Sequence, residues 1–361
     1  MNRLQRIQIW QVLLSLAMLA ALAVSYKLWL GQRDFPLVPV ADWWPVMPHP
    51  FDWILVGGLG LSLLLAAIFR KNRIFPFLIV TLLVVLALFD QNRWQSWVYF
   101  YGLMWVVLMP FGRYFHRYQD TDRIIMMGRQ LMGAAFVWTG ILGLNAAYSD
   151  GNALSWLGQV APGYGFPNHW MNWMLPAVEV LTGGLLLLKM TRYLGVGLAI
   201  SLQIMYLFAF GRPEQASAFM AWIHHGSLLL FTILLFVGRT DHNKRSSFVD
   251  CLKVPLYRAV LLLVWLAPAL YFTGYWDTNL AAQLHPVPQQ HDVSVTVGTE
   301  VSELLPASAQ KALKPCPEGM VLDLNRWSKT ELRVPLIPEP RMVQELVEEL
   351  PADEDLLAGH P

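Results

Sequence analysis

Long runs of apolar residues recur along this chain between residues 9 and 275, and they constrain its fold more than any other feature. A helix needs about 20 mostly apolar residues to cross a bilayer. Charged residues make up 14% of the chain, against roughly 25% in a soluble domain. We therefore predict an all-α polytopic membrane protein of about nine transmembrane helices, over residues 9–30, 52–69, 74–89, 97–112, 124–147, 171–189, 193–210, 219–237 and 255–275.

Lys and Arg residues near the ends of these segments predict their orientation. With nine crossings, 15 basic residues fall on the side of the N-terminus, and only Arg33, Arg93 and Arg212 fall on the other side before residue 277. Basic residues accumulate on the cytoplasmic side of membrane proteins. We expect a cytoplasmic N-terminus, an extracytoplasmic C-terminus and a plasma membrane or bacterial inner membrane location. The cytoplasmic accumulation of Lys and Arg accounts for the basic loops, so they do not indicate a nucleic-acid partner.

The first apolar segment allows a second interpretation. Arg3 and Arg6 precede it, and Ala21-Leu22-Ala23 resembles the cleavage site of a secretory signal peptide. The apolar run nevertheless continues through Trp29 and Leu30. We favour an uncleaved helix, and cleavage would leave the side of the C-terminal tail unchanged.

The chain divides at residue 276 into a membrane domain (1–276) and an acidic tail (277–361). The tail carries 14 Asp and Glu residues against six Lys and Arg. HDVSVTV (291–297) alternates like a strand, whereas PRMVQELVEEL (340–350) has apolar residues on one helical face. We predict a small extracytoplasmic α+β domain with a frayed end. Cys251 and Cys316 fall on opposite sides of the membrane and should not pair.

Several polar side chains fall where the chain should be surrounded by lipid. Ionisable residues inside membrane helices are costly and therefore mark functional positions. We predict an outward-facing polar cavity lined by Asp90, Arg93, Trp97, Tyr101, Asn145, Glu179, Gln203, His224 and His225. Helix packing is the competing explanation for each residue taken singly. Because adjacent helical residues diverge by about 100°, His224 and His225 do not predict a metal site.

Three segments share an ordered pattern of motifs: FDQNRWQSWVYFYG (89–102), FVWTGILGLNAAYSDGNALSWL (136–157) and LPAVEVLTGGLLLL (175–188). They resemble successive blocks of the HTTM domain, the membrane domain of vitamin K-dependent gamma-carboxylase-like proteins. The resemblance covers roughly residues 10–275, and residues 322–343 resemble the region that follows the domain in some bacterial members. It implies an all-helical membrane fold with a cytoplasmic N-terminus and an exterior C-terminal domain.

For true carboxylases the resemblance implies chemistry on a reduced quinone. A deprotonated Lys at the end of the fifth helix is the base, and a His before the Tyr-x-Tyr motif assists. In this chain those positions fall on Gly143 and Trp97, and a further family His aligns with Gln203. Neither Gly nor Trp can act as a base. Glu179 and Asn145 match family positions that we expect to maintain the fold.

Three functions follow from these patterns. The first is a non-carboxylating HTTM-like protein that binds a quinone, another membrane lipid or an envelope protein partner, the last through its tail. The second is a quinone-linked enzyme with His224, His225 or Glu179 as its base. The third is a small-solute transporter, although no inverted repeat supports it. We expect no metal, and a quinone is the only cofactor that the patterns favour.

Overall fold

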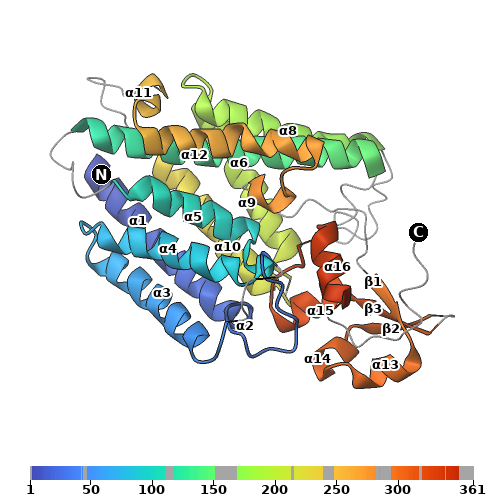
Figure 1. Ribbon diagram of the computed structural model, residues 1–361. Helices are drawn as coiled ribbons and strands as arrows, with labels where there is room; N and C mark the ends of the chain where they lie inside the picture. Colours follow the sequence, from blue (N-terminus) through green and yellow to red (C-terminus); the bar gives the residue numbers. More distant parts are fainter. Residues whose placement is uncertain are drawn as a thin grey trace.

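The computed structural model describes residues 2–41, 43, 47–110, 118–150, 169–212, 215–238, 248–281, 284, 294–316, 319–337 and 339–348. A bundle of apolar helices occupies most of this structure, and a small α+β tail lies against one end of it (Figure 1). The predicted mostly helical fold with a small C-terminal α+β region is therefore confirmed. Residues 111–117, 151–168 and 349–361 lie outside the described residues. The ends of the predicted segment 97–112, of the motif 136–157 and of the predicted helix 340–350 fall in these ranges.

Six helical stretches among the described residues are long and apolar enough to cross a membrane. They are α1 (Arg3–Val24), α3 (Phe51–Ile68), Thr121–Asn145 within α6 (Tyr118–Asp150), α9 (Arg192–Phe210), α10 (Ala218–Phe236), and α12 (Pro255–Trp265) continued by the 3-10 helix η2 (Ala267–Thr273).

Three further apolar helices match predicted segments but are shorter than these six. They are α4 (Ile74–Leu88), α5 (Ser96–Leu108) and α8 (His169–Leu187), whose apolar part is Trp173–Leu187. At 1.5 Å per residue, the 15 residues of α4 rise about 22 Å, whereas the apolar core of a bilayer is about 30 Å thick. Helix length among the described residues thus supports six crossings directly.

Two predicted segments are interrupted. The first divides into α1 and the short α2 (Tyr26–Trp29), separated by Ser25, whose hydroxyl donates to the Ala21 carbonyl at 2.7 Å. The last changes from α12 to η2 just before Pro268, which has no N–H group to continue the α-helical pattern. Both interruptions lie toward the end of the bundle that carries the tail (Figure 1).

Glycines bring α6 and α8 unusually close together. A Cβ atom at Gly140 would lie 2.4 Å from the Pro176 carbonyl oxygen, and one at Gly183 would lie 2.6 Å from the Gly133 carbonyl oxygen. Such distances exclude any larger side chain without a shift of the backbone. Small residues at membrane-helix contacts allow this close approach.

The tail contains a three-stranded antiparallel sheet of order β1-β3-β2, made of β1 (Ser294–Val297), β2 (Leu313–Cys316) and β3 (Gly319–Asp323). Its helices are α13 (Thr299–Leu304), α14 (Ala307–Gln310), α15 (Leu324–Glu331) and α16 (Pro340–Glu348). The strand predicted within 291–297 is present over Ser294–Val297, and the amphipathic helix predicted for 340–350 is present over Pro340–Glu348. Met342 and Leu346 of α16 are fully buried, as its apolar face requires. The pairing of β2 with β3 was not predicted.

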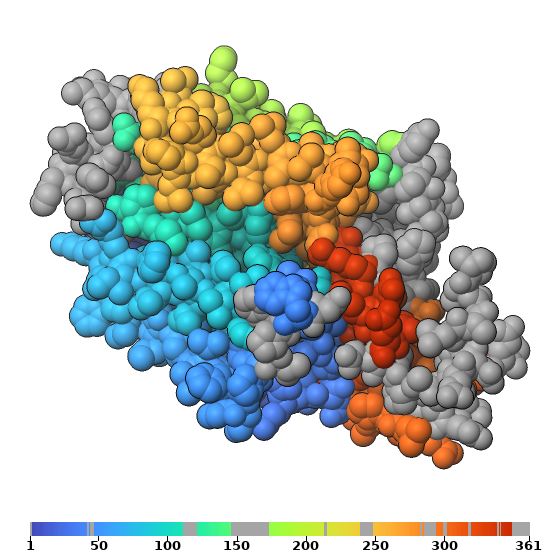
Figure 2. Space-filling model, viewed as in Figure 1, coloured from blue at the N-terminus to red at the C-terminus, as the bar shows by residue number. Residues whose placement is uncertain are grey.

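The tail packs against the end of the bundle at which α2, the loop 31–41 and the short helix η1 (Gln91–Arg93) meet. The Lys27 ammonium lies 2.8 Å from the Glu331 carboxylate, and the Phe35 and Trp327 rings are 4.8 Å apart. The Gln95 amide donates to the Pro335 carbonyl at 3.1 Å. Figure 2 shows α16, in red, next to the orange residues that follow α12.

Two carboxyl groups lie at this junction, next to the 3-10 helix η3 (Thr278–Ala281). Glu339 accepts hydrogen bonds from the Thr278 amide and hydroxyl, each at 3.1 Å, and Asp277 pairs with Arg341. Burial raises the pKa of Glu339 above its ordinary value, and nearby Asp277 raises it further. Burial also raises the pKa of Asp277, against the opposing effect of Arg341.

These raised pKa values predict that tail docking strengthens in mild acid. A carboxyl group whose pKa is higher in the docked state binds its proton more tightly there, so docking gains stability as pH falls through that raised pKa. Amide hydrogen exchange of α16, expressed as protection factors, should show greater protection in mild acid than at neutral pH. Glu339→Gln should reduce this difference. Equal protection at both pH values would contradict the prediction.

Candidate functional site

Asp90 forms the centre of a buried ion cluster with Arg33 and Arg93. Its Oδ2 lies 2.8 Å from Arg33 Nη2 and 3.6 Å from Arg93 Nε, and all three side chains are at most 1% exposed. Its Oδ1 accepts a hydrogen bond from the Asn92 amide at 3.1 Å, which caps η1. Asp90 thus pairs with two cations, Arg93 on its own short helix and the more distant Arg33.

The two guanidinium groups also bind carbonyl oxygens at helix ends. Arg93 donates to Leu28, Trp29 and Leu86 at 2.8–3.1 Å, at the ends of α2 and α4. Arg33 donates to Leu28, Phe35 and Pro36, each at 2.9 Å. Burial lowers the pKa of Arg93 to about 10, so the side chain still carries its charge at neutral pH. The cluster uses its donors for backbone carbonyls and therefore acts as a structural clamp.

A second group of polar side chains lies inside the bundle, on α5, α8, α9 and α10. We call it the polar helix network, and it consists of Tyr101, Glu179, Gln203, Tyr206, His224, His225 and Ser227. The Tyr206 hydroxyl donates to the Glu179 carboxylate, His225 Nδ1 lies 2.8 Å from Gln203 Oε1, and the Tyr101 and Ser227 hydroxyl oxygens are 2.6 Å apart. All except His224 are at least nine-tenths buried.

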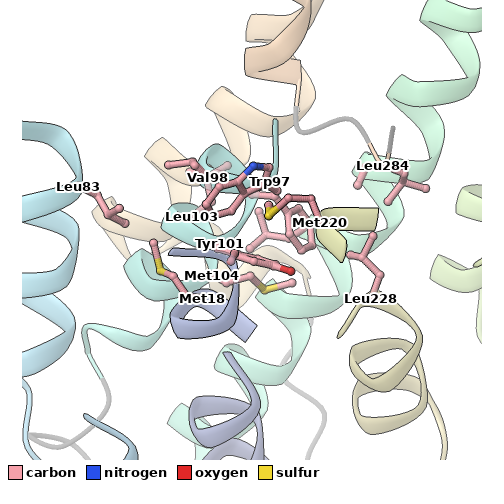
Figure 3. Close-up of a cluster of buried hydrophobic side chains, with 14 of the residues drawn as sticks. Met18, Leu83, Trp97, Val98, Tyr101, Leu103, Met104, Met220, Leu228 and Leu284 are labelled. Carbon is pink, nitrogen blue, oxygen red and sulfur yellow. The ribbon is translucent and has the colours of Figure 1, made fainter. Parts of the chain in front are cut away.

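A row of rings connects this network to the clamp. The Trp97 ring lies 6.1 Å from Trp29 and 5.9 Å from Tyr101, between centroids. Tyr101 lies 5.8 Å from the His224 ring, and the His224 and His225 rings are 5.4 Å apart. Figure 3 shows Trp97 and Tyr101 side by side on α5, with Met220 of α10 packed against them.

Two buried donors along this row lack an acceptor among the residues that the structure describes. They are the Trp97 indole N–H and the Gln203 Nε2 amide, on side chains 7% and 0% exposed. A buried donor without a partner costs about 1–3 kcal/mol. A ligand oxygen that accepted either hydrogen bond would remove that cost.

The predicted site residues therefore fall into two groups, joined by Trp97. Asp90 and Arg93 are enclosed under the tail, whereas Tyr101, Glu179, Gln203, His224 and His225 belong to the polar helix network. Asn145 lies near the end of α6 and is half-buried. Trp97 packs within the bundle, where its ring lies against those of Trp29 and Tyr101.

Sequence reasoning missed Arg33, Tyr206 and Ser227. Tyr206 follows Gln203 by three residues in α9, so the two share a helix face, and that spacing was a usable signal. Arg33 was one of only three basic residues expected on the outer side. The single hydroxyl of Ser227 carried no such signal.

Gly143 and Trp97, the residues at which the resemblance places the bases of true carboxylases, are both enclosed. A Cβ atom at Gly143 would lie 3.0 Å from the Pro176 ring, so that ring would have to shift to admit a side chain there. Trp97 fills the other position and is 7% exposed. These contacts give both residues a role in packing.

Removing the charge of Asp90 should destabilise the whole protein. Asp90→Asn would leave two buried guanidinium groups without their anion, and breaking a buried ion pair costs about 3–5 kcal/mol. The loss would be measured as the free energy of unfolding in a denaturing-detergent titration. Asp250→Asn is the matched control, because its pair with Lys253 is exposed at 2.8 Å and should contribute at most about 1 kcal/mol. Equal losses in the two variants would refute the clamp.

Comparisons of the chain with protein-family models, with curated proteins and with solved structures find no match. The resemblance to the HTTM domain consequently stays a prediction.

Proposed function

We propose that this chain is an integral membrane protein of the HTTM type that crosses the bilayer nine times and lacks carboxylase activity. Its N-terminus would be cytoplasmic and its tail extracytoplasmic, in a plasma or bacterial inner membrane. Support comes from the basic residues at one end of the bundle. Arg3 pairs with Asp122 there at 2.6 Å, and Arg70, Lys71 and Arg73 lie in the α3–α4 loop at the same end. The tail lies at the other end (Figure 1).

We further propose that the polar helix network binds a lipid-soluble molecule with a flat ring and oxygen acceptors, for which a quinone is the model. The observation that carries this proposal is the row of rings with two buried donors, Trp97 Nε1 and Gln203 Nε2, that have no acceptor among the described residues. Quinone carbonyl oxygens accept hydrogen bonds, and the ring can lie against aromatic side chains. The enclosed bundle would favour entry from the lipid phase.

A second candidate is an enzyme that acts on such a quinone. The observation favouring it is a buried pair of ionisable groups, in which the Tyr206 hydroxyl donates to the Glu179 carboxylate. The Tyr206 ring lies beside the imidazole of His225. A buried carboxylate near an imidazole is an arrangement in which a proton can be moved. In this alternative Glu179, His224 or His225 would be the base.

The topology predicts the position of reporters fused to the full chain. A reporter fused after Pro361 should be active only if it functions outside the cytoplasm, whereas one inserted in the α3–α4 loop should be active only in the cytoplasm. Insertion after Gly274, between η2 and the tail, is a control that should match the C-terminal fusion. A cytoplasmic signal from the fusion after Pro361 would contradict the proposed topology.

The ligand is testable by mass spectrometry of the protein purified in mild detergent. We expect a quinone or similar ring lipid in stoichiometric amount, and we expect Gln203→Leu to retain it roughly two- to tenfold less, as the loss of one hydrogen bond implies. Thr232→Val is the matched control, since Thr232 is buried in α10 and its hydroxyl donates to the Leu228 carbonyl of the same helix at 2.8 Å.

Three results separate the candidates. Equal retention by the Gln203 variant and the control would place the ligand elsewhere. A stoichiometric protein with no small molecule would favour a subunit role instead. Quinone turnover that disappears in both His224→Gln and His225→Gln, with retention of the quinone preserved, would favour the enzyme.

A further inference from the structure

A pocket of about 1000 Å³ opens at the end of the bundle opposite the tail, between α1 and the α3–α4 loop. Its walls combine the cations Arg70, Lys71 and Arg73 with apolar and neutral polar side chains, and none of the described residues that line it is acidic. None of the three cations forms an ion pair with a residue that the structure describes. We propose that this pocket binds the phosphate headgroup of an anionic phospholipid.

The fold holds the two walls of the pocket at a set separation. The buried side chain of Gln11 on α1 donates to the Ala66 carbonyl at the end of α3, at 2.9 Å. Across the loop, Asn72 Oδ1 accepts a hydrogen bond from the Ile74 amide at 2.9 Å, which shapes the start of α4. The basic side chains are therefore carried on a braced turn. A headgroup would meet this arrangement already formed.

The charge of the pocket selects the headgroup. Guanidinium groups match a phosphate oxygen pair with two parallel hydrogen bonds, and Lys adds a third positive charge. A phosphodiester headgroup without a balancing amine would neutralise part of this charge. A zwitterionic headgroup would bring its own cation into the same space, where the three basic residues would repel it.

The rim of the pocket selects a lipid over a free phosphate. Ile68, Phe69, Ile74 and Phe77 are more than half exposed, although they flank charged residues. They continue the exposed apolar faces of α3 and α4, which include Leu61 and Leu64. Acyl chains attached to a bound phosphate could lie along these side chains, whereas inorganic phosphate would leave them uncovered. Basic pockets between membrane helices commonly take anionic lipids for the same reasons.

This lipid site is independent of the ring ligand at the polar helix network, because the two lie in different parts of the bundle. It requires only that the helices sit in a membrane. Failure of the quinone experiment would leave the lipid proposal intact, and failure of the lipid experiment would leave the quinone proposal intact.

The test is native mass spectrometry of the full chain in detergent with equal amounts of phosphatidylglycerol and phosphatidylcholine. We expect preferential retention of phosphatidylglycerol. The variant Arg70→Gln/Lys71→Gln/Arg73→Gln should retain roughly a hundredfold less, because each basic residue strengthens binding to an anionic lipid about fivefold. The control Lys189→Gln/Lys253→Gln/Arg258→Gln loses the same charge at exposed positions outside the pocket and should retain nearly as much as the unaltered protein.

Several outcomes would overturn the proposal. Equal losses in the two triple variants would reduce the effect to overall charge. Equal retention of both lipids, or displacement of phosphatidylglycerol by a similar concentration of inorganic phosphate, would refute a lipid site. If the pocket variant fails to fold, the unaltered protein still decides the matter, because added salt should weaken its retention of phosphatidylglycerol.

Discussion

The clamp of Arg33, Asp90 and Arg93 organises one end of the bundle. Helix ends leave carbonyl oxygens without partners, and an apolar bundle has few other groups to satisfy them. Arg93 supplies donors to the ends of α2 and α4, Arg33 supplies them to the loop that follows α2, and Asp90 balances part of their charge. Because the tail packs on this loop through Phe35 and Trp327, the clamp also determines where the tail can dock.

The clamp and the polar helix network have different chemical capacities. The guanidinium groups of the clamp are committed to backbone oxygens and held in place under the tail. The polar helix network pairs side chains with side chains, and it leaves donors at Trp97 and Gln203 without an acceptor among the described residues. The polar helix network is therefore better suited than the clamp to a role in conformational change or in chemistry. The Trp97 ring contacts Tyr101 of the network and Trp29, whose carbonyl accepts a hydrogen bond from Arg93 of the clamp.

Much of the helical framework could be predicted, whereas the lengths and interruptions of the helices could not. Hydrophobicity located the nine apolar segments, but Ser25 and Pro268 divide two of them, and α5 ends at Leu108, before the end of the predicted segment 97–112. In the tail, alternation revealed β1 and helical periodicity revealed α16. The short strands β2 and β3 escaped because the segment Leu313–Cys316 includes Lys314 and Pro315, which do not read as a strand.

The sequence by itself determined which segments are apolar, where the basic residues gather and which ionisable residues enter the bundle. These properties depend on composition and on local periodicity. Only the tertiary structure decided that Tyr101 meets Ser227, 126 residues away, that Glu179 meets Tyr206, and that Asp90 and Arg93 are enclosed under the tail. Helix packing brings these partners together, and the crossing of α6 and α8 depends on glycines whose missing Cβ atoms matter only once a neighbour is in place.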